Sequence, residues 1–177
     1  MSKIYFNKIR EVKSPTQAYE TAAATDFYIP EYSQTFYDDL MSLPFNKEYC
    51  RCDISPNADS MNITIAPGGR INIPSGIRVI IEDTNTCLLA VNKSGIATKK
   101  ALVCGACLVD SDYRGEIHLS LLNVSDRPVT VSTGDKLVQF MHLITPETTY
   151  EEISCNKFNA SPVTSRGSNG FGSSDNL

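Results

Sequence analysis

Short apolar segments recur along this chain at regular intervals, and this rhythm limits the folds that it can adopt. The segments are Met61–Ile65, Ile71–Ile73, Ile77–Ile81, Cys87–Val91, Ala101–Val109, Ile117–Val124, Val129–Val131 and Leu137–Ile144. Turn residues separate them, as in Pro67-Gly68-Gly69 and Thr133-Gly134-Asp135. Many short strands joined by Gly, Pro and Asp turns are typical of an all-β sandwich, barrel or jelly roll. We therefore predict an all-β fold.

Two regions depart from this rhythm. Residues 31–62 are rich in Tyr, Asp and Ser without a clear strand period, and we interpret them as an inserted excursion. Within them, residues 33–43 are a candidate short helix with Ser33 as its N-cap. Residues 155–177 are rich in Ser, Asn and Gly and cannot bury enough apolar surface to fold alone. The prediction is one β domain over residues 1–154 and a flexible arm over residues 155–177.

The charge and composition of the chain exclude several classes of function. A net charge of −4 gives no general attraction to nucleic acid or to anionic membranes, so we expect no direct nucleic-acid binding. No apolar run is long enough to span a membrane, and the first residues lack the apolar core of a signal peptide. We expect a cytoplasmic protein, in the host cytoplasm if the chain is viral. The six cysteines fit that compartment as free thiols, because Cys104 and Cys107 have no second metal-binding pair at zinc-ribbon spacing.

A polar break separates two of the predicted strands. It reads Val109-Asp110-Ser111-Asp112-Tyr113-Arg114-Gly115-Glu116-Ile117. The strands on either side would hold such a turn rigid, which favours a binding site. The alternative is an acidic hairpin tip without chemistry, and this segment alone slightly favours that alternative.

Three other positions also have two interpretations each. Lys93-Ser94-Gly95 follows a predicted strand, and its backbone N–H groups would bind an anion or begin an ordinary helix. Gln139 alternates with apolar neighbours and is either a buried polar ligand or a solvent-facing residue. Asp26 lies among apolar residues and is either a ligand or part of a turn.

Five segments resemble, in order and spacing, the five motifs of the trimeric all-β dUTP pyrophosphatases (dUTPases). In chain order they are Ala22–Tyr28, Lys93–Ala97, Leu108–Gly115, Thr133–Phe140 and Arg166–Ser174. The third, Leu-Val-Asp-Ser-Asp-Tyr-Arg-Gly, is a close match to the family pattern. The resemblance covers most of residues 22–174 apart from the excursion, which lies between the first two motifs.

The resemblance implies a distorted jelly roll or β-barrel with a glycine-rich C-terminal arm. It implies a homotrimer in which the arm of one subunit closes over the site of a neighbour. It also implies a dUTP diphosphatase that uses Mg²⁺ and hydrolyses dUTP to dUMP and pyrophosphate by in-line attack of water on the α-phosphorus. Such an enzyme keeps uracil out of DNA and supplies dUMP for thymidylate synthesis.

The resemblance also assigns roles to residues. Asp110 would orient and activate the attacking water, and Tyr113 would pack under the deoxyribose, where a ribose 2′-OH would clash. The strand before Asp110, which includes Leu108, would read uracil through its backbone groups. The residues expected to contact the phosphates are Lys93, Ser94, Gly95 and Gln139.

Two further sets of contacts follow from the same resemblance. Arg166 would reach the terminal phosphate and Phe171 would stack over the uracil, with the rest of the arm contributing Gly170, Gly172 and Ser173. Mg²⁺ would be held mainly by the triphosphate and by water, with Asp26 in its outer shell.

A dCTP deaminase of the same fold is the nearest enzymatic alternative. In that family the segment after the third motif carries a catalytic Glu in a Thr-Leu-Glu-Leu pattern. Here the equivalent run is His118-Leu119-Ser120-Leu121, and Ser120 stands at the Glu position. Glu116 shares its strand parity but lies two residues too early, so the sequence favours the dUTPase.

A nucleotide-gated protein-binding module is an alternative of a different class. The residues that suggest it are the apolar and aromatic side chains of the excursion: Tyr32, Phe36, Tyr37, Met41, Phe45 and Tyr49. They form a surface for a protein partner or pack against the barrel, and we favour packing against the barrel. We interpret the excursion as an addition to the barrel, so we expect deletion of residues 33–60 to leave dUTP hydrolysis largely intact.

Overall fold

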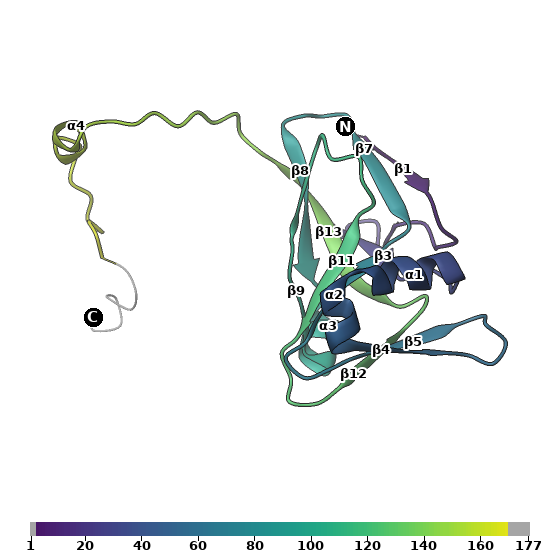
Figure 1. The fold of residues 1–177 in the computed structure, drawn as a ribbon. Coiled ribbons are helices and arrows are strands. Elements are labelled where there is room, and N and C mark those ends of the chain that lie inside the picture. Colours follow the sequence, from purple (N-terminus) through teal and green to yellow (C-terminus); the bar gives the residue numbers. More distant parts are fainter. Residues whose placement is uncertain (1–2, 170–177) are drawn as a thin grey trace. The chain divides into compact units, whose positions relative to one another are not determined.

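The computed structural model describes residues 3–169 and is built mainly of β-strands (Figure 1). The strands are β1 (Ile4–Lys8), β2 (Thr16–Gln17), β3 (Ala24–Tyr28), β4 (Cys50–Ile54), β5 (Met61–Ile65), β6 (Arg70–Pro74), β7 (Ile77–Ile81), β8 (Thr86–Asn92), β9 (Leu102–Cys104), β10 (Leu108–Asp110), β11 (His118–Asn123), β12 (Val129–Ser132) and β13 (Lys136–Ile144). The helices are α1 (Gln34–Ser42), α2 (Pro44–Tyr49), α3 (Ser94–Lys100) and α4 (Cys155–Asn159). The predicted all-β class is confirmed.

The chain divides into two compact units, Met1–Pro146 and Glu147–Leu177. Between residues 3 and 169, every strand belongs to the first unit. The second unit contains α4 and the described part of the arm, and its residues from 147 to 169 are all exposed. Among residues 3–169, no helix is long and apolar enough to cross a bilayer.

The strands of the first unit form four sheets. The largest has the order β10-β8-β13-β3-β2, and the others are β6-β11-β9, β12-β5-β4 and the ribbon β1-β7. Their inward faces share one core, in which the rings of Phe27 and Phe140 lie 4.6 Å apart. Alternating buried and exposed residues, as in β5 and β7, explain this arrangement, because successive side chains of a strand point to opposite faces.

One predicted strand is in fact two. The apolar run Ala101–Val109 breaks at Gly105, where the chain leaves β9 and turns into β10. β9 pairs with β11, whereas β10 pairs with β8 in another sheet, so the hairpin joins two sheets. A Cβ on Gly105 would lie 2.7 Å from the Ser120 hydroxyl, and this close approach is why the break falls at a glycine.

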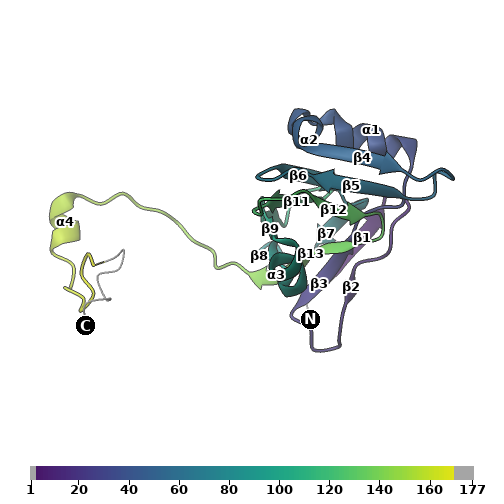
Figure 2. The same cartoon turned by 90° about the horizontal axis from the view of Figure 1, so that it is seen from below.

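Residues 31–62 are more regular than predicted. α1 begins after Ser33, whose hydroxyl accepts a hydrogen bond from the Phe36 N–H at 3.1 Å, so the predicted N-cap is confirmed. The segment also contains a strand that the sequence analysis did not predict, since β4 follows α2 and pairs along its length with β5. α1 and α2 lie together on one side of the first unit, next to β4 (Figure 2).

The same segment contributes to the core. Phe36 and Leu40 of α1 are fully buried. The Asn46 amide of α2 donates to the Leu40 carbonyl at 2.6 Å and to the Asn72 carbonyl at 2.9 Å, and its oxygen accepts from the Asn72 N–H at 3.1 Å. A buried amide satisfied in this way ties the helices to β6. This packing does not favour the expectation that deletion of residues 33–60 leaves dUTP hydrolysis largely intact.

Candidate active site

The polar break of the sequence forms the turn that follows β10. Asp110 ends the strand with an exposed side chain, and the Tyr113 N–H donates to the Asp110 carbonyl at 3.1 Å. β10 is held in turn by β8, with Asp110 opposite Cys87. The carboxylate of Asp110 therefore stands at the rim of a sheet, on a backbone fixed by strand pairing.

A pocket of about 210 Å³ opens beside this turn. Its lining residues come from the hairpin, the turn and the facing strands: Ala106, Cys107, Leu108, Val109, Asp110, Tyr113, Glu116, Ile117, His118 and Phe140. Apolar walls with a few polar groups at the rim suit a planar base attached to a sugar. The structure thus brings together Leu108, Asp110 and Tyr113, which the sequence analysis assigned to base, water and sugar.

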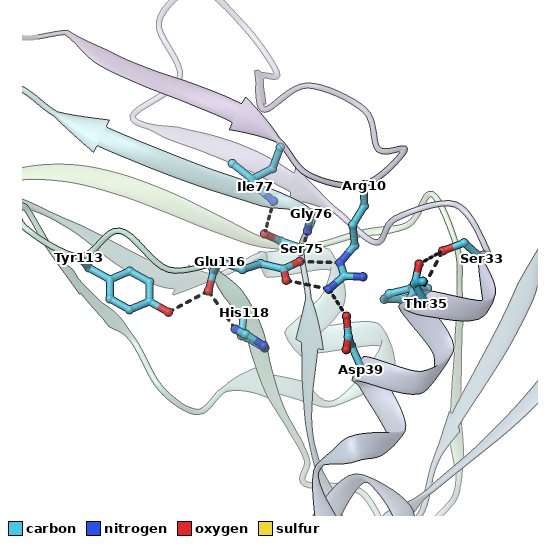
Figure 3. A network of polar contacts seen from close by, with 11 residues as sticks. Arg10, Ser33, Thr35, Asp39, Ser75, Gly76, Ile77, Tyr113, Glu116 and His118 are labelled. Atoms are coloured by element: carbon cyan, nitrogen blue, oxygen red, sulfur yellow. Dashed lines mark hydrogen bonds and ion pairs between the residues drawn. The ribbon is translucent and has the colours of Figure 1, made fainter.

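The Tyr113 side chain is fixed by its own turn. Its hydroxyl donates to the Glu116 carbonyl at 3.0 Å, and His118 Nδ1 lies 3.0 Å from the same carbonyl oxygen (Figure 3). The ring crosses so close to Gly115 that a Cβ there would lie 2.3 Å from the Tyr113 hydroxyl. Glycine at this position is therefore required for the tyrosine to occupy the pocket wall.

The carboxylate of Glu116 is engaged elsewhere. Arg10 holds it with a fork, Nε to Oε1 at 2.8 Å and Nη2 to Oε2 at 2.9 Å, and the Gly76 N–H donates to Oε1 at 2.7 Å (Figure 3). The same Arg10 Nη2 lies 2.6 Å from Asp39 Oδ2 of α1. The hydrogen bonds from Arg10 to these carboxylates outweigh the effect of burial and raise the pKa of the guanidinium, so it stays charged.

A second polar cluster lies on the sheet of β3, β13 and β8. Asp26 is only 2% exposed, and its Oδ1 accepts from Lys93 Nζ while its Oδ2 lies 2.9 Å from Lys136 Nζ. Burial alone would raise the pKa of Asp26, but the two ammonium groups outweigh it and lower the pKa below the usual value. Asp26 is therefore an anion between two cations.

The rest of the predicted phosphate contacts surround this cluster. Gln139 pairs with Asp26 across β13 and β3, is half-buried, and donates from Nε2 to the Asn92 carbonyl at 3.0 Å. Ser94 and Gly95 begin α3, directly after Lys93, and both are exposed. A Cβ on Gly95 would meet nothing within 4 Å, so the space above the start of α3 is open.

The pocket residues around Asp110 and the predicted phosphate residues around Lys93 lie toward opposite ends of β8. Asp110 is level with Cys87, whereas Lys93 follows Asn92 at the far end of that strand. Six residues of extended chain separate Cys87 from Lys93, which corresponds to about 20 Å. Within one chain, the structure therefore brings the base and sugar residues together, and separately the phosphate residues, but does not join the two sets.

The arm carries the remaining predicted contacts. Arg166 is exposed, and its Nε donates to the Asn169 carbonyl at 3.1 Å within the arm. Gly167 has a φ of 53°. Gly170, Phe171, Gly172 and Ser173 lie outside the described residues.

Sequence comparison shows the family. Residues 58–175 match the profile of the dUTPase family. The chain belongs to the dUTPase family. A deoxyuridine 5′-triphosphate nucleotidohydrolase of Actinobacillus pleuropneumoniae serotype 3 is 38% identical over 114 residues, which cover 63% of this chain and 72% of that protein. A protein of the same name from Legionella pneumophila (strain Paris) is 36% identical over 112 residues, which cover 62% and 70%. This dUTPase hydrolyses dUTP.

Solved dUTPase structures share the fold. The enzyme of Staphylococcus bacteriophage 80alpha, solved with dUPNHPP, has a TM-score of 0.64 at 16% identity and covers 97% of each chain. The Streptococcus mutans dUTPase has a TM-score of 0.58 at 18% identity over 82% of this chain and 98% of that one. A phage phi11 dUTPase of S. aureus, described with a structural Mg(II) ion, has a TM-score of 0.61 at 16% identity over 85% and 96%. The jelly-roll-like prediction is confirmed.

The deaminase alternative finds no support in this dUTPase. Ser120 occupies the position of the deaminase Glu, and the Glu116 carboxylate is bound by Arg10 and the Gly76 N–H. Both carboxylate oxygens are therefore occupied by Arg10, and one of them also by the Gly76 N–H. The Glu116 carboxylate is not placed to carry protons for deamination.

Two residues of the site escaped the sequence analysis. Lys136 lies inside the fourth motif segment, so its charge next to Gln139 was a usable signal. Arg10 lies outside every motif, and its contact with Glu116 joins residues 106 positions apart. Local patterns contain no information about such a contact.

Proposed function

We propose that this dUTPase binds the uracil and deoxyribose of dUTP in the pocket beside Tyr113 and cleaves the nucleotide to dUMP and pyrophosphate. One observation carries the proposal: Leu108, Asp110 and Tyr113 line the same pocket. A base against the hairpin backbone would place the sugar over Tyr113 and the α-phosphorus near the rim, where Asp110 stands. Water activated there would attack the phosphorus in line with the leaving pyrophosphate.

In this proposal Asp110 is the general base and Tyr113 excludes ribonucleotides. Asp110 is exposed to water at the rim, so it can orient a water molecule and take its proton. The Tyr113 ring, anchored through its hydroxyl, would lie under the sugar and leave no room for a 2′-OH. Backbone groups of residues 106–108 would form hydrogen bonds with uracil, and cytosine would leave some of them unpaired.

Lys93, Ser94, Gly95 and Gln139 form the proposed phosphate site. The Lys93 ammonium has three donors and one is directed at Asp26, so two remain for phosphate oxygens. Ser94 and Gly95 are exposed at the open start of α3. Asp26 fixes Lys93 and Lys136 near this surface. The arm would add Arg166 at the terminal phosphate and Phe171 over the base, with Gly170, Gly172 and Ser173 beside them.

Mg²⁺ fits this site as a partner of the substrate rather than of the protein. In the described part of the chain, no three His, Cys, Asp or Glu side chains gather as a metal-binding group. Both oxygens of Asp26 face ammonium groups, so Asp26 would act on a phosphate-bound ion only through water and those lysines. When bound to the triphosphate, Mg²⁺ supplies positive charge that offsets the charge developing on the oxygens.

A homotrimer would join the two halves of the site. Along β8, about 20 Å separate the base and sugar residues from the phosphate residues. This distance follows from a rise of about 3.3 Å per residue in a strand. A neighbouring subunit that presents its phosphate half to this pocket would complete one site, and a closed ring repeats that contact. The arm would then close over the site of a neighbour.

The cellular role follows from the reaction. Removing dUTP keeps uracil out of DNA, and the product dUMP supplies thymidylate synthesis. A cytoplasmic location fits six cysteines that are all free thiols. Burial raises the pKa of Cys50 to about 12 and that of Cys104 to about 11, which keeps these thiols protonated and unreactive.

The test is pyrophosphate release with Mg²⁺ from dUTP, dCTP, dTTP and UTP by the full chain and by Asp110→Asn. We expect rapid release from dUTP alone. Asp110→Asn should still bind nucleotide but turn it over roughly 10²–10⁴-fold more slowly, because the base is lost. Asp112→Asn, the same change at an exposed residue of the same turn, is the matched control and should stay near the wild-type rate.

Three other outcomes would contradict the proposal. Near-wild-type turnover by Asp110→Asn would remove Asp110 as the base. Ammonia release from dCTP would indicate a deaminase. No turnover of any nucleotide, with dUTP still bound, would favour the nucleotide-gated binding module and direct attention to residues 31–62.

A further inference from the structure

Glu116 has two sets of partners on opposite sides of its backbone. Its carboxylate accepts from Arg10 at 2.8 and 2.9 Å and from the Gly76 N–H at 2.7 Å. Its carbonyl oxygen accepts from the Tyr113 hydroxyl at 3.0 Å, and His118 Nδ1 lies 3.0 Å from it. The side chain thus belongs to the ion network drawn in Figure 3, and the residue also lines the pocket beside Tyr113.

Buried contacts on several sides hold the ion network of Arg10, Glu116 and Gly76 rigid. The side chains of Arg10 and Glu116 are only 11% and 12% exposed, and their contact is a two-bonded fork. Gly76, the third member, has a φ of 74°, and a Cβ there would lie 3.0 Å from Val12 and 3.1 Å from Arg10. Any other residue at Gly76 would strain the turn and crowd Arg10. The Glu116 backbone is therefore held in one place.

We propose that Glu116, held by Arg10, is a positioning residue that sets the discrimination of this enzyme against ribonucleotides. The inference rests on the proposed function, in which Tyr113 packs under the deoxyribose. Glu116 acts through Tyr113 and touches no reacting atom. A tyrosine whose hydroxyl is anchored to a fixed carbonyl cannot retreat from a 2′-OH, whereas a tyrosine on a loose carbonyl can.

The contact between Arg10 and Asp39, on the exposed side of the network, contributes less to its rigidity. Asp39 contacts the same Arg10 Nη2 at 2.6 Å, but its side chain is 57% exposed. Ion pairs open to water are screened and contribute little to rigidity. The contact ties α1 to the network, but Arg10 keeps both bonds to Glu116 without it. Asp39 is therefore the matched control for Glu116.

The experiment compares kcat/KM for dUTP and for UTP in the full chain and in Glu116→Gln. The ratio of the two should fall roughly three- to tenfold, the loss expected when one hydrogen-bonded anchor is weakened. The change should be a gain in the use of UTP through a lower KM. A merely structural role would reduce the fraction of folded enzyme, which affects both substrates equally and leaves the ratio unchanged.

Two further variants keep the inference falsifiable if Glu116→Gln folds poorly. Arg10→Lys keeps the charge but loses the planar fork, and Tyr113→Phe removes the anchored hydroxyl. Both should lower the same ratio, and Asp39→Asn should leave it unchanged. An unchanged ratio in Arg10→Lys and Tyr113→Phe would overturn the inference, as would an equal fall in Asp39→Asn. Failure of the wild-type chain to hydrolyse dUTP would instead contradict the proposed function itself.

Discussion

At the scale of single residues, the Asp26 cluster makes stability depend on pH. The pKa of Asp26 is lowered from its ordinary value of 3.8, because Lys93 and Lys136 outweigh its burial. A carboxylate with a lowered folded-state pKa contributes stability that is fully present above its unfolded pKa. That contribution is lost as the pH falls through the lowered value, when Asp26 takes up a proton and the pairs with both lysines weaken.

We predict that Asp26→Asn removes this contribution. At neutral pH the variant should be less stable than wild type by roughly 1–3 kcal/mol, because it leaves two ammonium groups without their anion. The difference should shrink as the pH falls below about 4. Urea denaturation of both proteins at several pH values measures it. Asp53→Asn, at an exposed position, is the control, and a difference independent of pH would show that charge is not the cause.

The sequence identified Asp26 but not its partners. Its place in the first motif suggested a role near Mg²⁺, and the structure pairs it with Lys93 and Lys136, which come from distant parts of the chain. By contrast, the turn that carries Asp110 and Tyr113 was predicted, because it is local and lies between two clearly patterned strands. Contacts close in sequence leave a local pattern, whereas long-range ion pairs do not.

At the scale of elements, the segment α1-α2-β4 is part of the core. We predict that Phe36→Ala lowers the free energy of unfolding by about 3–5 kcal/mol, because it leaves a cavity at a fully buried site. Asp38→Ala, on the exposed face of the same helix, should change it by only a few tenths of a kcal/mol. Denaturant titration checks both. Equal effects of the two changes would contradict the packing of α1 into the core.

The elements differ in how well the sequence revealed them. β5 and β7 were predicted with their observed bounds, because an apolar residue stands at every second position in both and these residues are the buried ones. β4 was missed although Cys50-Arg51-Cys52-Asp53-Ile54 alternates apolar and polar residues, because the run is short and lies in a segment that otherwise has no clear strand period. The break at Gly105 was missed because its cause is the close approach to Ser120 on β11, which only the folded structure shows.

At the scale of the whole molecule, the arm should serve activity rather than stability. Every residue from 147 to 169 is exposed, so this stretch has no apolar core of its own to lose. We predict that truncation after Val163 keeps Tm within about 2 °C of the full chain. The same truncation should strongly reduce turnover, because it removes Arg166 and Phe171. Parallel loss of Tm and turnover would show that the arm is structural.

The separation of the two half-sites predicts that subunits complement one another. Asp110→Asn damages the pocket half, and Gln139→Glu places a negative charge in the phosphate half, so each homotrimer alone should be nearly inactive. In the proposed trimer each site takes its halves from different subunits, so assembly from equal amounts of both variants would give two intact halves at about one quarter of the sites. Co-refolding the two variants should therefore restore about that share of dUTP hydrolysis, measured as pyrophosphate release.

The matched control is the double variant, Asp110→Asn with Gln139→Glu in one chain, co-refolded with wild type. Intact halves then come only from wild-type subunits. Activity should therefore rise with the wild-type share and should not exceed the value expected from dilution of the wild type alone. If each chain held a complete site, mixing the two single variants would restore nothing, because every chain carries one damaged half. That result would mean that the arrangement along β8 closes within a single subunit when dUTP binds, and the shared-site trimer would be wrong.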